Sequence, residues 1–134
     1  MTGETDLSKL IQEMKPEIRQ IELVFCTLPW DDIPQTTIDP LLLFKEVEGM
    51  TIILPKAKAR QLGFSFENTW TWIELSVHSS LDAVGFIAAV THALAEADIS
   101  VNVVSAFNHD HLFVPDKQAK KAIKVLEEMI RNSS

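Results

Sequence analysis

The organisation of the chain is decided by residues 71–115, which read TWIELSVHSSLDAVGFIAAVTHALAEADISVNVVSAFNHDHLFVP. Residues at helical spacing run from Leu81 to Ala97, and two short β-branched segments follow at 101–106 and 111–114. Before them, alternate positions form one face of a half-buried strand, namely Thr71, Ile73, Leu75 and Val77. Strand, helix, strand, strand makes up three quarters of a split βαβ unit. Pro115 then opens a final helix, a position where its missing N–H is harmless.

The composition indicates a folded acidic protein. With 134 residues the chain has room for one ordinary domain or two very small ones, and an apolar fraction of 46% is enough for a packed core. The net charge of −7 argues against nucleic-acid binding, because neutralising phosphates supplies most of that affinity. A group of lysines is followed by Glu127 and Glu128, as on a solvated helix face: Lys117, Lys120, Lys121 and Lys124.

The sequence also indicates a cytoplasmic location. Cys26 is the only cysteine, so no disulfide forms within the chain, and its apolar neighbours are those of an ordinary buried thiol. Residues 1–10 lack the basic and apolar regions of a signal peptide. No apolar run approaches the length that spans a bilayer. We therefore expect a cytoplasmic protein with no membrane partner.

Shorter elements are predicted in the N-terminal half. A helix over residues 7–14 is capped by Asp6 and ends before Pro16, because the residue before a proline disfavours the α region. The other predicted elements are a strand at 22–27, a loop at 29–40, an extended segment at 41–46, a strand at 51–54 and a short helix from Pro55 that Gly63 ends.

A short internal echo links the two halves of the chain. Residues 52–55 (IILP) followed by Ala59 match residues 112–115 (LFVP) followed by Ala119, at a separation of 60 positions. Each copy is an apolar strand that runs directly into a helix started by proline. Two units of one design would explain the match.

The turn between the first strand and the helix of residues 71–115 is the candidate ligand site. Ser79 and Asp82 have the three-residue spacing of a capping box, and a helix N-terminus offers free N–H groups to a carboxylate or phosphate. Gly85 permits close approach of a ligand, and Asn102 can both donate and accept hydrogen bonds. Such a turn could hold a zwitterion, with its ammonium on Asp82 or Asn102. The alternative stays open that Ser79 and Asp82 only cap the helix and that Gly85 only lets it pack.

Two motifs in this region resemble those of the ACT domain family of amino-acid-sensing modules: Asp82-Ala83-Val84-Gly85 after a strand, and Ile99-Ser100-Val101-Asn102-Val103 one helix later. The family's usual loop is Asp-x-Pro-Gly, so Val84 replaces the proline, and Asp98 stands where glycine is common. The chain is also similar over nearly its whole length to small stand-alone proteins of two ACT-like units, through residues 44–51, 78–81 and 109–111.

This resemblance implies an α+β fold of two tandem ferredoxin-like (βαββαβ-type) ACT-like units with antiparallel sheets joined side by side. The units are expected at residues 1–66, which are divergent, and 67–134. Because residues 132–134 leave no room for a fourth strand after the last helix, the second sheet needs a strand from the N-terminal half, for which we predict Glu22 to Thr27.

The resemblance also implies a non-catalytic module that binds a small amino acid at a unit or subunit interface. A homodimer or higher homo-oligomer is expected, with no catalytic residue, metal or cofactor. The implied ligand-binding residues are Ser79, Ser80, Leu81, Asp82, Ala83, Val84, Gly85, Asn102, Val103 and Val104.

Two other functions remain open from the sequence. His109 and His111 share one face of an extended segment, and with His78 they could form the centre of a metal-assisted enzyme. The chain could instead be a pure oligomerisation module without a ligand. Trp70 and Trp72 lie on the second face of their strand and require a cover, either the N-terminal helix or a partner subunit.

Overall fold

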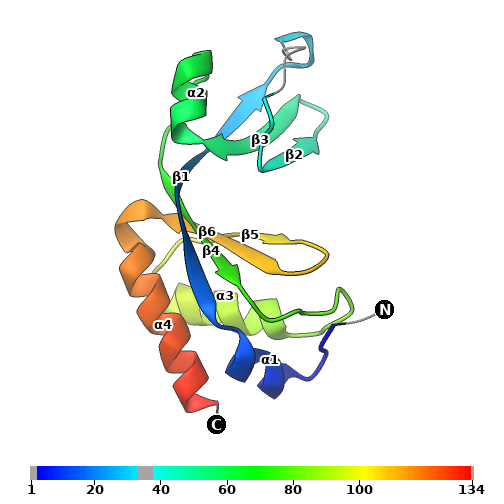
Figure 1. Ribbon diagram of the computed structural model, residues 1–134, viewed down its shortest axis with the longest axis vertical. Coiled ribbons are helices and arrows are strands. Elements are labelled where there is room, and N and C mark those ends of the chain that lie inside the picture. Colours follow the sequence, from blue (N-terminus) through cyan, green and yellow to red (C-terminus); the bar gives the residue numbers. More distant parts are fainter. Residues whose placement is uncertain (1–2, 33–37, 134) are drawn as a thin grey trace. The chain divides into compact units, whose positions relative to one another are not determined.

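The computed structural model describes residues 3–32 and 38–133 (Figure 1). Its contacts divide the chain into two compact units. The composite unit combines the residues up to Gln20 with those from Thr71 onward, and the inserted unit is Ile21–Trp70. The predicted loop at 29–40 lies partly outside the described residues.

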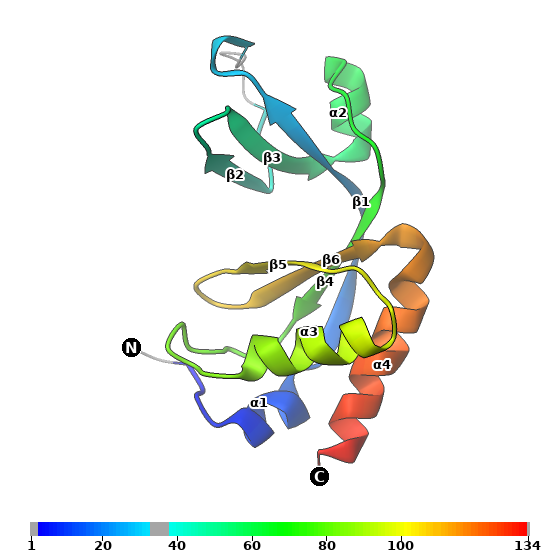
Figure 2. The same cartoon turned by 180° about the vertical axis from the view of Figure 1, so that it is seen from behind.

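The composite unit is an antiparallel α+β unit with its helices on one face (Figure 2). Its strand order is β1-β4-β6-β5, with the last two paired from Asn102↔Phe113 to Ser105↔Asp110. The elements are α1 (Leu7–Glu13), β1 (Pro16–Leu28), β4 (Trp70–Leu75), α3 (Phe86–Glu96), β5 (Asn102–Ser105), β6 (Asp110–Pro115), the 3₁₀ turn η2 (Asp116–Gln118) and α4 (Ala119–Asn132).

The core of the composite unit lies between these strands and the three helices. Ile73 and Leu75 of β4 and Leu112 and Val114 of β6 are fully buried, as period-two alternation predicts. They pack against one apolar face of each helix, including Leu10, Met14, Val90, Leu94 and Leu126. Each such side chain contributes roughly 1.5–3 kcal/mol by leaving water, so this layer holds the unit together.

The strand that completes this sheet comes from the N-terminal half, but from another part of it than predicted. β1 neighbours β4, and its residues up to Gln20 belong to the composite unit. The predicted segment Glu22 to Thr27 lies in the inserted unit instead, where β1 pairs with β3 from Leu23↔Pro55 to Leu28↔Met50. The thirteen-residue strand β1 therefore contributes to both units.

The inserted unit is a smaller antiparallel sheet with strand order β2-β3-β1. Its core contains Val24, Cys26, Ile52, Leu54 and Ala59. Gly63 ends its helix as predicted, in the left-handed conformation with φ 74°. Its other elements are η1 (Trp30–Asp32), β2 (Leu42–Lys45), β3 (Met50–Pro55) and α2 (Lys56–Leu62).

The internal echo is confirmed as a structural repeat. β2 and β3 correspond to β5 and β6 at a separation of 60 positions, and β3 and β6 have the same burial at each of their six residues. Pro55 and Pro115 both have ψ 137°, with φ −59° and −55°. The predicted fold class, tandem ferredoxin-like units with antiparallel sheets, is therefore confirmed.

The predicted start of the helix is wrong, and one of the two covers considered for the tryptophans is excluded for Trp72. α3 begins at Phe86 rather than Leu81, because Ser80 folds the preceding residues into a turn: its carbonyl accepts from Ala83 N at 3.0 Å and its hydroxyl from Asp82 N at 3.1 Å. Ser79 therefore caps nothing. α1 does not cover Trp72, since it packs with α3 and α4 on the core face.

Candidate functional site

A cavity of about 160 Å³ lies in the composite unit at the start of α3. The loop after β4 forms one wall through Ser79, Ser80, Leu81, Ala83 and Gly85. The first turn of α3 forms a second wall, and the end of β5 with the start of β6 forms a third, through Phe86, Ile87, Ala88, Ser105, Ala106 and Asp110. Residues 79–88 and 105–110, which are separated in sequence, therefore meet at one small site.

The helix end that faces the cavity has free backbone donors. Gly85 precedes α3 with φ 92°, no side chain caps the helix, and Ala89 N donates to Gly85 O at 2.9 Å. Within residues 3–32 and 38–133, the amides of Phe86, Ile87 and Ala88 have no acceptor. These donors and the partial positive charge of the helix end favour an anionic group.

The opposite charge is supplied by Asp110. Asp110 is only 5% exposed. Its carboxylate lines the cavity and has no hydrogen bond or ion pair to any residue that the structure describes. Asp110 shares the core side of β6 with Leu112 and Val114, and its ladder partner Ser105 brings a hydroxyl to the same cavity. The cavity thus has a side suited to an anion and a side suited to a cation.

The structure brings together five of the ten predicted ligand-binding residues. Asp82 and Val84 are exposed and do not line the cavity. Asn102, Val103 and Val104 do not line it either. Val103, opposite Leu112, faces the core, so its neighbours Asn102 and Val104 project from the other face. Within this unit the helix amides therefore face Ser105 and Asp110 rather than Asn102.

Sequence reasoning missed Asp110 as a ligand-binding candidate, although a signal was present. Counting back by two from the apolar Val114 and Leu112 places Asp110 on the buried face of the same strand. A charged residue on an apolar face marks a position that needs a partner. Nothing local identifies Phe86 to Ala88, because the helix start was predicted too early.

The N-terminal segment holds the cavity loop in place. Glu4 N donates to His78 O at 2.8 Å, and Ser80 N donates to Glu4 O at 3.0 Å. Gly3 lies so close that a Cβ there would be 2.9 Å from the Ser80 backbone, and its φ of 115° also favours glycine. Backbone N–H groups, first that of Asp6, and the Lys9 ammonium lower the pKa of the Glu4 carboxyl. This anchoring fixes the shape of the loop that precedes α3.

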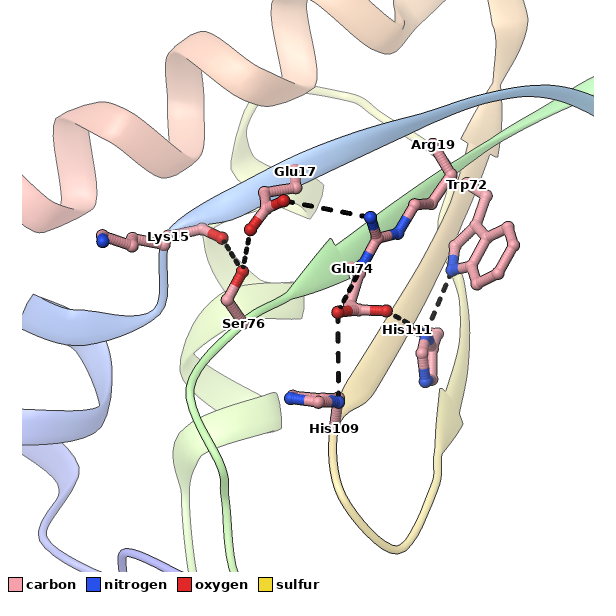
Figure 3. Close-up of polar contacts among 8 residues, drawn as sticks. All are labelled: Lys15, Glu17, Arg19, Trp72, Glu74, Ser76, His109 and His111. Carbon is pink, nitrogen blue, oxygen red and sulfur yellow. Dashed lines mark hydrogen bonds and ion pairs between the residues drawn. The ribbon is translucent and has the colours of Figure 1, made fainter.

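A second group of polar side chains lies on the other face of the composite sheet (Figure 3). Arg19 Nη2 donates to Glu74 Oε2 at 2.7 Å, and Trp72 Nε1 donates to His111 Nδ1 at 3.0 Å. His109 Nδ1 and His111 Nδ1 each lie 3.9 Å from a Glu74 oxygen. Burial lowers the pKa of His111.

The histidines do not form the metal centre of the enzyme alternative. Among the described residues, no group of three or more His, Cys, Asp or Glu side chains has metal-binding geometry. The rings of His78 and His109 are 6.5 Å apart and those of His109 and His111 6.4 Å. The Trp72 hydrogen bond occupies Nδ1 of His111, and the buried Nε2 of His78 has no partner in the described chain.

Comparison with known proteins identifies both halves of the chain. Residues 2–70 match one ACT domain model and residues 69–128 match a second. The mouse cytosolic arginine sensor for mTORC1 subunit 1 is 28% identical over 102 residues, and the rat protein is 26% identical over the same length. These matches cover 70% of this chain but only 31% of each sensor, so the chain spans about a third of the relatives' length.

Solved structures share the same fold. A Vibrio cholerae protein of unknown function, named as a possible transport protein, is 37% identical with a TM-score of 0.81, covering 92% of this chain and 95% of its own. The ligand-free regulatory subunit of aspartate kinase from Thermus thermophilus has a TM-score of 0.62 at 9% identity, covering 85% and 95%. The second likeness concerns the fold alone. Within the described ranges no helix has the length and apolar character to cross a membrane.

Proposed function

The chain belongs to the ACT domain family, and from that premise we propose that it is a non-catalytic module that binds a small free amino acid at the start of α3. The observation that carries the proposal is the pairing, in one cavity, of unsatisfied helix amides with the unpaired Asp110 carboxylate. An α-amino acid carries the two complementary charges on adjacent groups. Its carboxylate is suited to the amides of Phe86 to Ala88, and its ammonium to Asp110.

The size of the cavity favours a short side chain. A cavity of roughly 150 Å³ holds benzene, which has about six heavy atoms. The cavity here is about 160 Å³. Alanine and serine are close to that size, and the hydroxyls of Ser79 and Ser105 offer hydrogen bonds to a polar side chain. A longer ligand such as arginine requires additional volume from a neighbouring surface.

A second copy or another ACT unit is the expected source of that surface. Leu81, Val84 and Phe107 lie in or next to the cavity-lining segments, and their apolar side chains are exposed, Val84 by 85%. Exposed apolar side chains around a concave site are typical of surfaces that a partner covers. A homo-oligomer in which this surface is buried, with the bound amino acid at the interface, follows from the proposal.

The regulatory role and the location are part of the same proposal. The mouse and rat relatives are named as cytosolic arginine sensors. We infer that this chain is a cytoplasmic sensor whose ligand occupancy is read by another protein. The pure oligomerisation module differs from it in one respect, since its cavity would remain without a ligand.

A thermal-shift screen against the twenty amino acids tests the proposal, because a ligand that binds the native state raises its stability. We expect at least one amino acid to raise Tm at millimolar concentration. Asp110→Asn should weaken its binding about 10- to 100-fold, the range of a charge-assisted hydrogen bond. Asp82→Ala is the matched control, since that carboxylate is exposed outside the cavity, and should leave the shift unchanged. If no amino acid stabilises the wild type, the sensor function is wrong and the assembly module remains.

A further inference from the structure

The polar residues opposite the cavity form one connected array, which comprises Arg19, Trp72, Glu74, His109 and His111 (Figure 3). None of these residues lines the cavity. Asp110 nevertheless lies between the two histidines in sequence, with its own side chain on the cavity side of β6. The array and the cavity therefore lie on opposite faces of β6.

The hydrogen bond from Trp72 fixes the protonation state of His111. An indole N–H only donates, so Nδ1 of His111 accepts at 3.0 Å and carries no proton. Glu74 Oε1 lies 3.9 Å from the same nitrogen, beyond hydrogen-bonding distance. A proton arriving at Nδ1 breaks the bond from Trp72 and is attracted by Glu74. The imidazole thus has two mutually exclusive partners, one for each charge state.

Charged and titratable groups of β1, β4 and the start of β6 influence the pKa of this imidazole. Glu74 of β4 is held by Arg19 of β1, whose Nη1 also lies 3.9 Å from Glu17. His109 and Asp110 flank it on the chain, and the ring of His78 lies 6.5 Å from that of His109. Burial is the main cause that lowers the pKa of His111, reinforced by His109 and Arg19 and opposed by Glu74 and Asp110.

We propose that the charge of His111 regulates the cavity on the far side of its strand. The neutral imidazole, bonded to Trp72, leaves the Asp110 carboxylate available to an ammonium group. The imidazolium, paired with Glu74, places a positive charge beside Asp110 and repels that ammonium. The ligand in this mechanism rests on the proposed function, whereas the coupling between His111 and Asp110 does not.

The sign and size of the coupling follow from electrostatics. Positive charges about 10 Å apart near a protein surface, screened by physiological salt, weaken each other's binding by roughly three- to tenfold. Linkage is reciprocal, so a cation on Asp110 must make His111 harder to protonate by the same factor. Binding should therefore weaken as the pH falls through the lowered pKa of His111 and be unaffected well above it.

A pH titration by NMR on the ligand-free protein tests the coupling directly. We expect the imidazole resonances of His111 and the indole N–H resonance of Trp72 to shift in one common step in the wild type. Asp110→Asn removes the carboxylate that favours the imidazolium and should displace this step to lower pH. Asp110→Ser provides a second variant of the same kind, and Asp82→Ala is the control that should leave the step in place. The proposal is overturned if the midpoint of the His111 titration is the same in both Asp110 variants as in the wild type. It is also overturned if the Trp72 indole resonance does not shift with the His111 titration.

Calorimetry with L-alanine, L-serine and L-arginine as probes then tests the effect on binding. For each probe that binds, Kd should be three- to tenfold higher at a pH below the His111 step seen by NMR than at pH 7.5, and His111→Gln, whose amide oxygen can accept from Trp72, should remove the difference. A pH difference that survives in His111→Gln contradicts the regulation. Absence of binding by the full amino-acid panel defeats the proposed function, while the NMR result still decides the coupling.

Discussion

The two units share one design, and among the described residues the candidate site lies in the composite unit. Their hairpins correspond residue for residue at a separation of 60, with the same burial along β3 and β6. Where the composite unit has Ser105 and Asp110, the inserted unit has Lys45 and Met50. The eleven-residue α3 leads to β5, whereas the described residues between β1 and β2 contain only the short turn η1.

This difference shows that the repeat preserves the buried apolar positions but not the polar residues of the candidate site. Any apolar side chain of suitable size can fill the buried positions of β3 and β6, because burial is nondirectional. A ligand site needs particular polar groups, and at the equivalent hairpin positions the composite unit has Ser105 and Asp110 where the inserted unit has Lys45 and Met50. Paired substitutions at equivalent positions can therefore separate effects on folding from effects on binding.

The largest expected effect concerns the two cores. Leu112→Ala and Ile52→Ala occupy equivalent positions, and both wild-type side chains are fully buried. Each should lower the free energy of unfolding by about 2–5 kcal/mol, through lost transfer energy and an unfilled cavity. Urea unfolding measures both. A loss under about 1 kcal/mol at either site would show that its core repacks freely.

A smaller effect is expected at two left-handed glycines. Gly85 precedes α3 with φ 92°, and Gly63 follows α2 with φ 74°, while a Cβ has room at both positions. Alanine should cost about 1–2 kcal/mol at each, from backbone strain alone. Only Gly85→Ala should also weaken amino-acid binding, because it displaces the amides of the first turn. Equal loss of binding in Gly63→Ala would contradict the assignment of the site to one unit.

The smallest effect is a pH dependence of stability at His111, whose counterpart in the inserted unit is Thr51. Burial lowers the pKa of His111 in the folded protein from the unfolded value of 6.5. The stability linked to its neutral form is therefore present above pH 6.5 and is lost as the pH falls through the lowered pKa. The loss is at most about 1.4 kcal/mol for every tenfold change in proton affinity between the unfolded and folded protein. Tm should fall more steeply below pH 6.5 in the wild type than in His111→Gln, whereas Thr51→Val should not alter that slope.

Much of the fold could be predicted because its signals are local. Alternation identified β4 and β6, Pro55 and Pro115 marked the ends of two strands, and Gly63 marked the end of α2. The helix start was wrong because the spacing of Ser79 and Asp82 imitates a capping box, whereas Ser80 folds a separate turn. Five of the ten predicted site residues line the cavity, all from the loop before α3.

The remaining features depend on pairing between distant segments. Asp110 becomes a candidate ligand only when β6 is packed beneath α3, and Asn102 leaves the cavity because its ladder position turns it to the other face. The contacts among Arg19, Glu74 and His111 require β1, β4 and β6 to lie next to one another. No local sequence pattern specifies which residues of these three strands become neighbours.

The sequence by itself therefore determined the repeated strand units and their apolar faces, since periodicity and turn residues act over a few positions, and its motifs carried the resemblance to the ACT domain family. The tertiary structure alone decided which strand completes the composite sheet and which carboxylate faces the helix end. The physical reason is that side-chain direction alternates along a strand. A polar residue's function thus depends on the face to which long-range pairing assigns it.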